Sequence, residues 1–359
     1  MFKSIGYFCH ILHMCGKNTH QIMIRIFHQK LVIVFFVLGT GIILGPSTNP
    51  VAAQNNHSFM LRNGVIIDTE RNQAYIMNTE GGIDAVELTR GTLVWHTDQA
   101  DKPLALEGNQ LACQVQPKNP GNNLDITILN VEESGSLEDI YSIELPPDVR
   151  ISINETLNSS FTARARIVGG EIFVSWNYTF HPRKGTAPLN SSQRKQTSTQ
   201  PSDQQYQPVK GAARINLSTK ATSTINVQQI PASLTPVSPY LSGNNRLAGV
   251  PERQFISANG NHVLGSKRIE SDSVWSKYQW IIYDHVTGNR IAVIKNHLSY
   301  SPYFVNDGQI IFETGSYIRR IDNVLVKKPL KIMSVDLQNG RELWSWPIRD
   351  TRYRGPFPP

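Results

Sequence analysis

Histidine spacing is the first indicator of metal or acid–base chemistry in this sequence. Six histidines follow residue 54: His57, His96, His181, His262, His285 and His297. No two of them stand at the short spacing of a metal-binding pair, and a zinc site needs three or four convergent ligands. The sequence also lacks a Gly-x-Ser-x-Gly nucleophile turn, a phosphate-binding Gly-Lys-Ser/Thr loop and a dinucleotide-binding glycine motif. We therefore predict no catalytic, cofactor-binding or metal-binding residues, and no cofactor.

Acidic residues recur instead at one place in a repeated pattern. Residues 85–95 and 334–344 share six identical or closely similar residues at equal offsets, and residues 284–288 repeat part of the pattern without the tryptophan. The repeated residues are Glu87, Gly91 and Trp95, then Asp284 and Gly288, then Asp336, Gly340 and Trp344. The pattern predicts a hairpin in which the acid caps the turn and glycine takes a positive φ. The second strand of each hairpin then carries tryptophan to a packing site. We expect Asp84 to cap a turn in the same way.

The positions of these hairpins depend on strands, which the sequence predicts throughout the chain after residue 54. Short runs rich in Val, Ile, Tyr and Thr alternate with Gly, Asn, Asp and Pro, and helical periodicity is absent. Four strands at a time fit residues 61–98, 103–147, 160–230, 253–296 and 299–348. The predicted fold class is therefore all-β, a β-propeller of four-stranded antiparallel blades. We expect about five blades, with six or seven as the alternative.

The hairpins resemble the repeat of quinoprotein-type (PQQ-like) β-propellers, which reads roughly Ala-x-Asp-x-x-x-Gly-x-x-x-Trp. Residues 75–115 and 331–359 are most similar to it. The resemblance implies that Trp95 and Trp344 wedge between neighbouring blades. Enzymes of that family hold a quinone in a central funnel, with an Asp base, a bound Ca²⁺ and often a disulfide between adjacent cysteines. This chain has no adjacent cysteines and no evident Ca²⁺ cluster.

The N-terminus has the pattern of an export signal. Residues 31–45 form an uninterrupted apolar run after Arg25 and Lys30, and Val51 and Ala53 suit a cleavage site before Gln54. We therefore predict a signal peptide over residues 1–53, with an uncleaved membrane anchor as the alternative. The chain is then expected in the periplasm or outside the cell. Residues 54–359 are predicted to form a single propeller domain.

Charge and cysteine content argue against a nucleic-acid-binding protein and against a disulfide-linked domain. The formal net charge is +7, and residues 1–53 hold four basic residues and no acid, so 31 basic and 28 acidic residues remain, or +3. A nearly neutral domain does not favour nucleic-acid binding, which usually needs a dense basic stripe. Cys113 is the one cysteine after residue 53, which excludes an intrachain disulfide there. Its apolar–polar surroundings predict a buried thiol on a strand.

Three segments interrupt or follow the blade pattern. Residues 183–209 are polar and rich in Ser, Thr and Gln, which predicts a disordered loop within the third unit. Residues 231–252 contain four prolines and predict an irregular connection. The C-terminal tail carries the residues that we predict as partner contacts: Arg349, Arg352, Tyr353, Arg354 and Phe357. A clasp that packs the chain end onto the propeller is the alternative for this tail.

These observations predict an exported, non-enzymatic PQQ-like β-propeller that acts as a protein-binding or scaffold module in the cell envelope. The predicted partner is a protein and not nucleic acid, and membrane contact is expected only through an uncleaved N-terminal segment. Two alternatives remain. One is a quinoprotein-like oxidoreductase that uses the central funnel, and the other is a carbohydrate-binding surface module.

Overall fold

The structure is a computed structural model that describes residues 57–117, 121–149, 151, 159–180, 208–231, 238–250, 253–271, 276–321 and 324–350. The chain divides into two compact units, Met1–Asn55 and Asn56–Pro359, and every described residue belongs to the second. The predicted signal segment 1–53, residues 183–207 of the predicted loop and residues 351–359 of the tail lie outside the described residues. Within the described part, no helix has the length and apolarity to cross a membrane.

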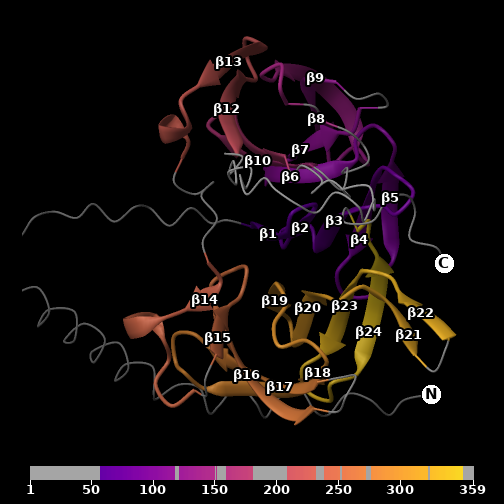
Figure 1. The fold of residues 1–359 in the computed structure, drawn as a ribbon, viewed down its shortest axis with the longest axis vertical. Helices are drawn as coiled ribbons and strands as arrows, with labels where there is room; N and C mark the ends of the chain where they lie inside the picture. Colours follow the sequence, from indigo (N-terminus) through magenta and orange to yellow (C-terminus); the bar gives the residue numbers. More distant parts are fainter. Residues whose placement is uncertain are drawn as a thin grey trace, which may run out of the picture. The chain divides into compact units, whose positions relative to one another are not determined.

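Five antiparallel sheets account for most of the described chain, and in each the strands pair in chain order (Figure 1). Sheet 1 contains β1 (Ser58–Arg62), β2 (Val65–Asp68), β3 (Gln73–Met77), β4 (Ile83–Glu87) and β5 (Leu93–Thr97). Sheet 2 contains β6 (Lys102–Glu107), β7 (Gln110–Val115), β8 (Asn123–Asn130) and β9 (Ser136–Glu144). Sheet 3 contains β10 (Ser159–Val168), β11 (Glu171–Phe180), β12 (Val209–Asn216) and β13 (Ala221–Ile225).

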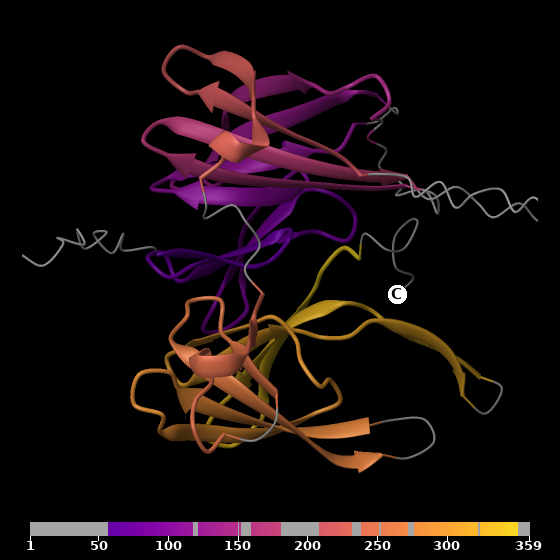
Figure 2. The same cartoon turned by 60° about the vertical axis from the view of Figure 1, so that its left-hand side comes forward.

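The second half of the chain repeats this arrangement with one insertion. Sheet 4 contains β14 (Tyr240–Leu241), β15 (Arg253–Ile256), β16 (His262–Ser271), β17 (Ser276–Asp284) and β18 (Arg290–Asn296). Sheet 5 contains β19 (Tyr303–Asn306), β20 (Gln309–Glu313), β23 (Lys331–Asp336) and β24 (Glu342–Pro347). Between β20 and β23 the chain forms a separate two-stranded sheet of β21 (Tyr317–Ile321) and β22 (Val324–Lys328), the gold hairpin in Figure 2.

The predicted all-β propeller class is confirmed, because each predicted four-strand unit coincides with one of the five sheets. The number of blades in a closed propeller stays a prediction. The strands β1 and β14 and the β21–β22 hairpin were not predicted from the sequence. The connection 231–252 was expected to be irregular, but it contains β14 and the 3-10 turn Gly243–Asn245. β14 is a strand because Tyr240 pairs with Phe255 at the start of sheet 4.

Alternation along the strands divides each sheet into two faces, and β3 shows how. Ala74 and Ile76 point into a core shared with sheet 5, whereas Tyr75 points into a core shared with sheet 2 and stacks on Trp95 with ring centroids 5.6 Å apart. Cys113 on β7 lies in that second core, fully buried as predicted, and burial raises the pKa of its thiol. Strands buried on both faces read as continuous apolar runs, which is why β2, β3 and β20 lack simple apolar–polar alternation.

Four buried cores join the sheets in pairs: sheets 1 and 2, sheets 2 and 3, sheets 5 and 1, and sheets 4 and 5. Among the residues that the structure describes, no such core joins sheet 3 to sheet 4. Sheets 1, 2 and 5 therefore contribute to a described core on both faces, and sheets 3 and 4 on one.

The turn before the last strand has the same geometry in three sheets. Glu87 accepts hydrogen bonds from the backbone N–H groups of Thr89 and Arg90 at 3.0 and 2.8 Å, and the N–H of Gly91 donates to the Glu87 carbonyl. Asp284 accepts the two equivalent backbone bonds in sheet 4, and Asp336 accepts one from Gln338 N–H and one from Asn339 Nδ2 in sheet 5. The glycine that closes each turn has a φ of 68 to 70°: Gly91, Gly288 and Gly340. This left-handed conformation favours glycine and fixes the entry to the last strand.

A side chain four residues beyond this turn contacts the corresponding turn of the next sheet. Trp344 of sheet 5 lies against Gly91, where any Cβ would overlap its indole, and its Nε1 donates to the Leu88 carbonyl at 2.6 Å. Trp95 of sheet 1 lies against Gly135 of sheet 2, where a Cβ would stand 2.7 Å from Trp95 Cζ3. We call this arrangement the junction contact.

The other junctions use different chemistry at the same place. Asp139, four residues after Gly135, pairs with Lys220 at 2.6 Å, and Lys220 holds a φ of 56° in the turn of sheet 3. In sheet 4, Ala292 stands where the tryptophan would be, and Ile294 lies 3.9 Å from the Cβ position of Gly340. The contact is missing between sheets 3 and 4. Thr224 is exposed there, and a Cβ at Gly288 would meet nothing within 4 Å.

The junction contact predicts unequal losses from one substitution at two equivalent turns. Gly91→Ala and Gly288→Ala both force a residue with a Cβ into a positive φ, but only at Gly91 does that Cβ overlap a tryptophan. We expect Gly91→Ala to lower the free energy of unfolding by about 1–3 kcal/mol more than Gly288→Ala. Urea unfolding of the two variants measures this difference. Equal losses would show that Trp344 does not constrain the turn.

Candidate functional site

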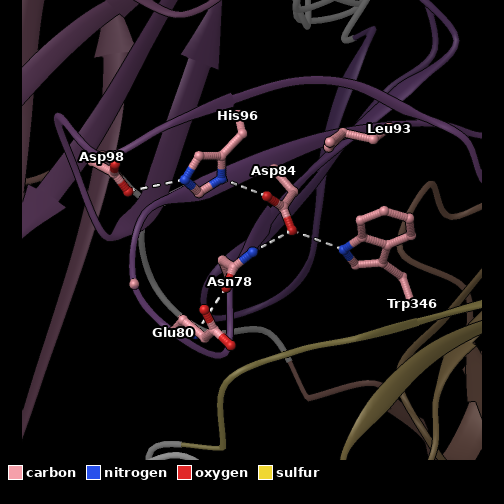
Figure 3. Close-up of a pocket in the computed structure, with 8 residues that line it drawn as sticks. Asn78, Glu80, Asp84, Leu93, His96, Asp98 and Trp346 are labelled. Atoms are coloured by element: carbon pink, nitrogen blue, oxygen red, sulfur yellow. Dashed lines mark hydrogen bonds and ion pairs between the residues drawn. The ribbon is translucent and has the colours of Figure 1, made fainter.

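A polar hollow of about 490 Å³ opens where β3, β4 and β5 of sheet 1 meet β24 of sheet 5 (Figure 3). Carboxylates, one histidine and two large apolar side chains line it: Asn78, Glu80, Gly81, Asp84, Leu93, His96, Asp98 and Trp346. Seven of these residues lie between positions 78 and 98, and Trp346 comes from the end of the chain. The packing of sheet 5 on sheet 1 therefore completes the hollow.

Asp84 is the centre of the hollow and is 2% exposed. Its Oδ1 lies 2.7 Å from His96 Nδ1, because Asp84 on β4 and His96 on β5 are directly paired across the hairpin. Its Oδ2 accepts hydrogen bonds from Asn78 Nδ2 at 2.8 Å and Trp346 Nε1 at 2.9 Å. A buried carboxylate is stable only with such partners. Asp84 thus ties three strands to one another (Figure 3).

His96 lies between two carboxylates. Its Nε2 is 2.9 Å from Oδ1 of Asp98, whose side chain is 84% exposed. The hydrogen bond to Asp84 raises the pKa of His96 above its ordinary value of 6.5, partial burial opposes this, and Asp98 raises the pKa further. Two acceptors favour the doubly protonated ring, because each ring nitrogen then donates. In its doubly protonated form the ring donates to both carboxylates and so positions them.

The remaining lining residues define what the hollow can recognise. Glu80 and Asp98 are exposed carboxylates at its rim, and Leu93 and Trp346 supply apolar surface. This combination suits a cationic or hydrogen-bond-donating group. Among the residues described, no group of three or more His, Cys, Asp and Glu side chains is placed to hold a metal ion.

The repeat residues predicted from the sequence lie elsewhere. Glu87, Gly91, Asp284, Gly288, Asp336 and Gly340 form the turns described above, and Trp95 and Trp344 lie in the cores between sheets. Of the predicted tail contacts, Arg349 is half-buried, and its N–H donates to the Met77 carbonyl of sheet 1 at 3.2 Å. Arg352, Tyr353, Arg354 and Phe357 lie outside the described residues.

The hollow was not predicted from the sequence, and the turn-capping role predicted for Asp84 is wrong. Asp84 does not cap a turn but accepts bonds from three side chains. The signal was present in the hairpin, because pairing Ala85 with Trp95 also sets Asp84 opposite His96. Nothing in the local sequence indicates Trp346, which arrives from 262 residues away.

Comparison with known proteins gives no family. No family model matches the chain, and no curated protein sequence matches it. Similar solved structures include the AtxE2 isopeptidase in its apo form, with 9% identity, a TM-score of 0.37, and coverage of 80% of this chain and 49% of that one. Dihydro-heme d1 dehydrogenase NirN in complex with DHE matches with 14% identity and a TM-score of 0.22 over 78% of this chain and 50% of that one. TolB from Acinetobacter baumannii matches with 12% identity and a TM-score of 0.24 over 79% and 61%. The chain thus spans about half to three-fifths of the length of these structures.

The His96 site predicts how stability depends on pH. A histidine whose pKa is raised in the folded state stabilises the fold fully at low pH, and this contribution is lost as pH rises through the folded pKa. We therefore expect the contribution of His96 to the free energy of unfolding to fall above pH 6.5. Comparing pH profiles of urea unfolding for the parent chain and for His96→Gln measures it.

NMR titration of His96 separates the two carboxylates. Asp84→Asn should lower the pKa of His96 more than Asp98→Asn, because the bond to buried Asp84 is the largest cause of the shift. The resonances of His262, which lies in sheet 4, serve as the control. A larger effect from Asp98→Asn would show that the exposed carboxylate dominates.

Proposed function

We propose that this chain is an exported PQQ-like β-propeller that binds a protein partner in the cell envelope as a scaffold module. The observation that carries the proposal is the exposed apolar surface of the last strand in four sheets. Side chains on β5, β9, β18 and β24 are 40 to 59% exposed: Leu93, Val94, Leu137, Ile140, Ile291, Val293 and Leu343.

Single exposed apolar residues are ordinary on a protein surface, but here they recur on equivalent strands. Each of these strands is also the last in its sheet, so one side of its backbone has no neighbour within the sheet. An exposed, apolar edge strand is a template for pairing with another chain. Backbone hydrogen bonds and side-chain burial would both contribute to such binding. This surface favours protein recognition over small-molecule chemistry.

Two further features support the proposal. The turns closed by Gly91, Gly288 and Gly340 share one geometry, as expected for a PQQ-like repeat. The apolar run and cleavage pattern of residues 1–53 support export. Because a propeller serves enzymes and scaffolds alike, the fold by itself does not decide between them.

Proximity crosslinking in the native cells, followed by mass spectrometry of fractionated envelope, tests this function. We expect a reproducible envelope partner that is recovered less with Ile140→Lys and Val293→Lys, which place charge on exposed edge strands. Val286→Lys is the matched control, because Val286 is 92% exposed in a turn and not on an edge strand. Recovery from the cytoplasm, or without any partner, would overturn the proposal. Deletion of residues 349–359 tests in the same assay whether the tail contributes.

A further inference from the structure

The polar hollow carries more negative than positive charge. Its lining includes one basic side chain, His96, and three carboxylates: Glu80, Asp84 and Asp98. Asp84 is fully engaged, because both of its oxygens accept the bonds described above. Glu80 is exposed, and no described residue bonds to its carboxylate. Asp98 is 84% exposed and contacts His96 through Oδ1, which leaves its second oxygen without a partner among the described residues. The hollow can therefore accept a cation at two of its carboxylates.

The basic side chains of sheet 1 have partners elsewhere. Its arginines pair with carboxylates outside the hollow: Arg62 with Glu313, Arg71 with Asp68 and Glu132, and Arg90 with Glu87. Lys102, at the start of sheet 2, is 7% exposed and has interactions of its own. None of these four basic side chains lines the hollow. A cation that binds Glu80 and Asp98 would therefore come from a segment outside the described residues, from another molecule or from solution.

The last described residues lie at the rim of the hollow. Trp346 lines the hollow, and three residues later the N–H of Arg349 donates to the Met77 carbonyl at 3.2 Å. The residue that follows Met77 lines the hollow as well. Asp350 is 5% exposed, so the chain is held in place up to the point where residues 351–359 begin.

Residues 351–359 carry the charge that the hollow lacks. They include two arginines, Arg352 and Arg354, and no acidic residue. An extended chain spans at most about 3.6 Å per residue, so the backbone of Arg352 lies within about 11 Å of Arg349. The nearest cations in the sequence are thus within reach of the exposed carboxylates.

We infer that the hollow is a guanidinium-binding site and that its occupant is an arginine of residues 351–359 of the same chain. A guanidinium group forms paired hydrogen bonds with a carboxylate and stacks on an aromatic face. Glu80 and Asp98 offer the carboxylates, and Trp346 offers an indole on the opposite side of the hollow (Figure 3). Leu93 is 50% exposed and adds apolar surface for the stem of the arginine. This inference gives the clasp predicted for the tail a defined site. It concerns contacts within one chain, so it stands independently of the proposed function.

NMR of the full chain with labelled tryptophan tests the inference. The indole resonance of Trp346, assigned with Trp346→Phe, should shift in the double variant Arg352→Gln/Arg354→Gln, because the guanidinium then leaves the ring. The indole of Trp280 lies in sheet 4 and should not move, which reports that the fold is retained.

A matched double variant separates the site from general charge effects. Arg290→Gln/Arg341→Gln removes two positive charges from exposed positions at the last hairpins of sheets 4 and 5, and it should leave the Trp346 resonance unchanged. An equal shift in this control, or no shift when Arg352 and Arg354 are replaced, would overturn the inference.

A peptide titration identifies the occupant. A chain that ends at Asp350 should bind a synthetic peptide of residues 351–357, followed by the Trp346 shift, at least tenfold more tightly than the same peptide with glutamine for both arginines. Glu80→Gln in that shortened chain should weaken binding about twofold to fivefold, as expected for an exposed ion pair. Glu70→Gln, which removes an exposed carboxylate elsewhere in sheet 1, should not.

The full chain provides the decisive comparison, because its own arginine should compete with the peptide. We expect the peptide to bind the full chain at least tenfold more weakly than the shortened chain. Equal binding would overturn the inference and assign the hollow to an arginine of another molecule. None of these results depends on an envelope partner, so crosslinking tests the proposed function separately.

Discussion

The contact between a side chain on the last strand and the turn of the next sheet, present at four junctions, is the constraint on which the described fold depends. Where Trp344 lies on Gly91 and Trp95 on Gly135, the indole occupies the space that a Cβ would need. Glycine therefore serves twice at Gly91, by allowing a positive φ and by leaving room for the neighbour. A turn and a junction between sheets are consequently specified by the same residue.

The polar hollow is a product of this constraint. Trp344 and Trp346 are two residues apart on β24, so their side chains lie on the same face of the strand. Trp344 fixes that face against Leu88 and Gly91, and Trp346 is then placed to donate to Asp84. Asp84 in turn orients His96. The electrostatics of the hollow thus depend on how two sheets pack and not on the hairpin of sheet 1 alone.

Local sequence predicted the fold well because the blades are local structures. Each sheet pairs its strands in chain order, so runs of β-branched residues and turn formers were sufficient to predict all five units. β1 and β14 were missed because each adds to a sheet that already had four predicted strands. The hollow was missed for a different reason. Its Asp84–His96 pair depends on hairpin register, and Trp346 on a contact across 262 residues, which no local pattern encodes.

The pairing of sheet 5 with sheet 1 also bears on the order in which the chain is made. Sheet 1 leaves the ribosome before the other four sheets, and folding units generally form as they emerge. Yet one face of that sheet, including Val65 and Ile76, shares its core with Ile332 and Trp344 of sheet 5, which follow more than 240 residues later. Sheets 2 and 3 complete their common core much earlier. This apolar face of sheet 1 is therefore exposed through most of translation. Until sheet 5 is made, its protection from aggregation depends on factors that bind the nascent chain.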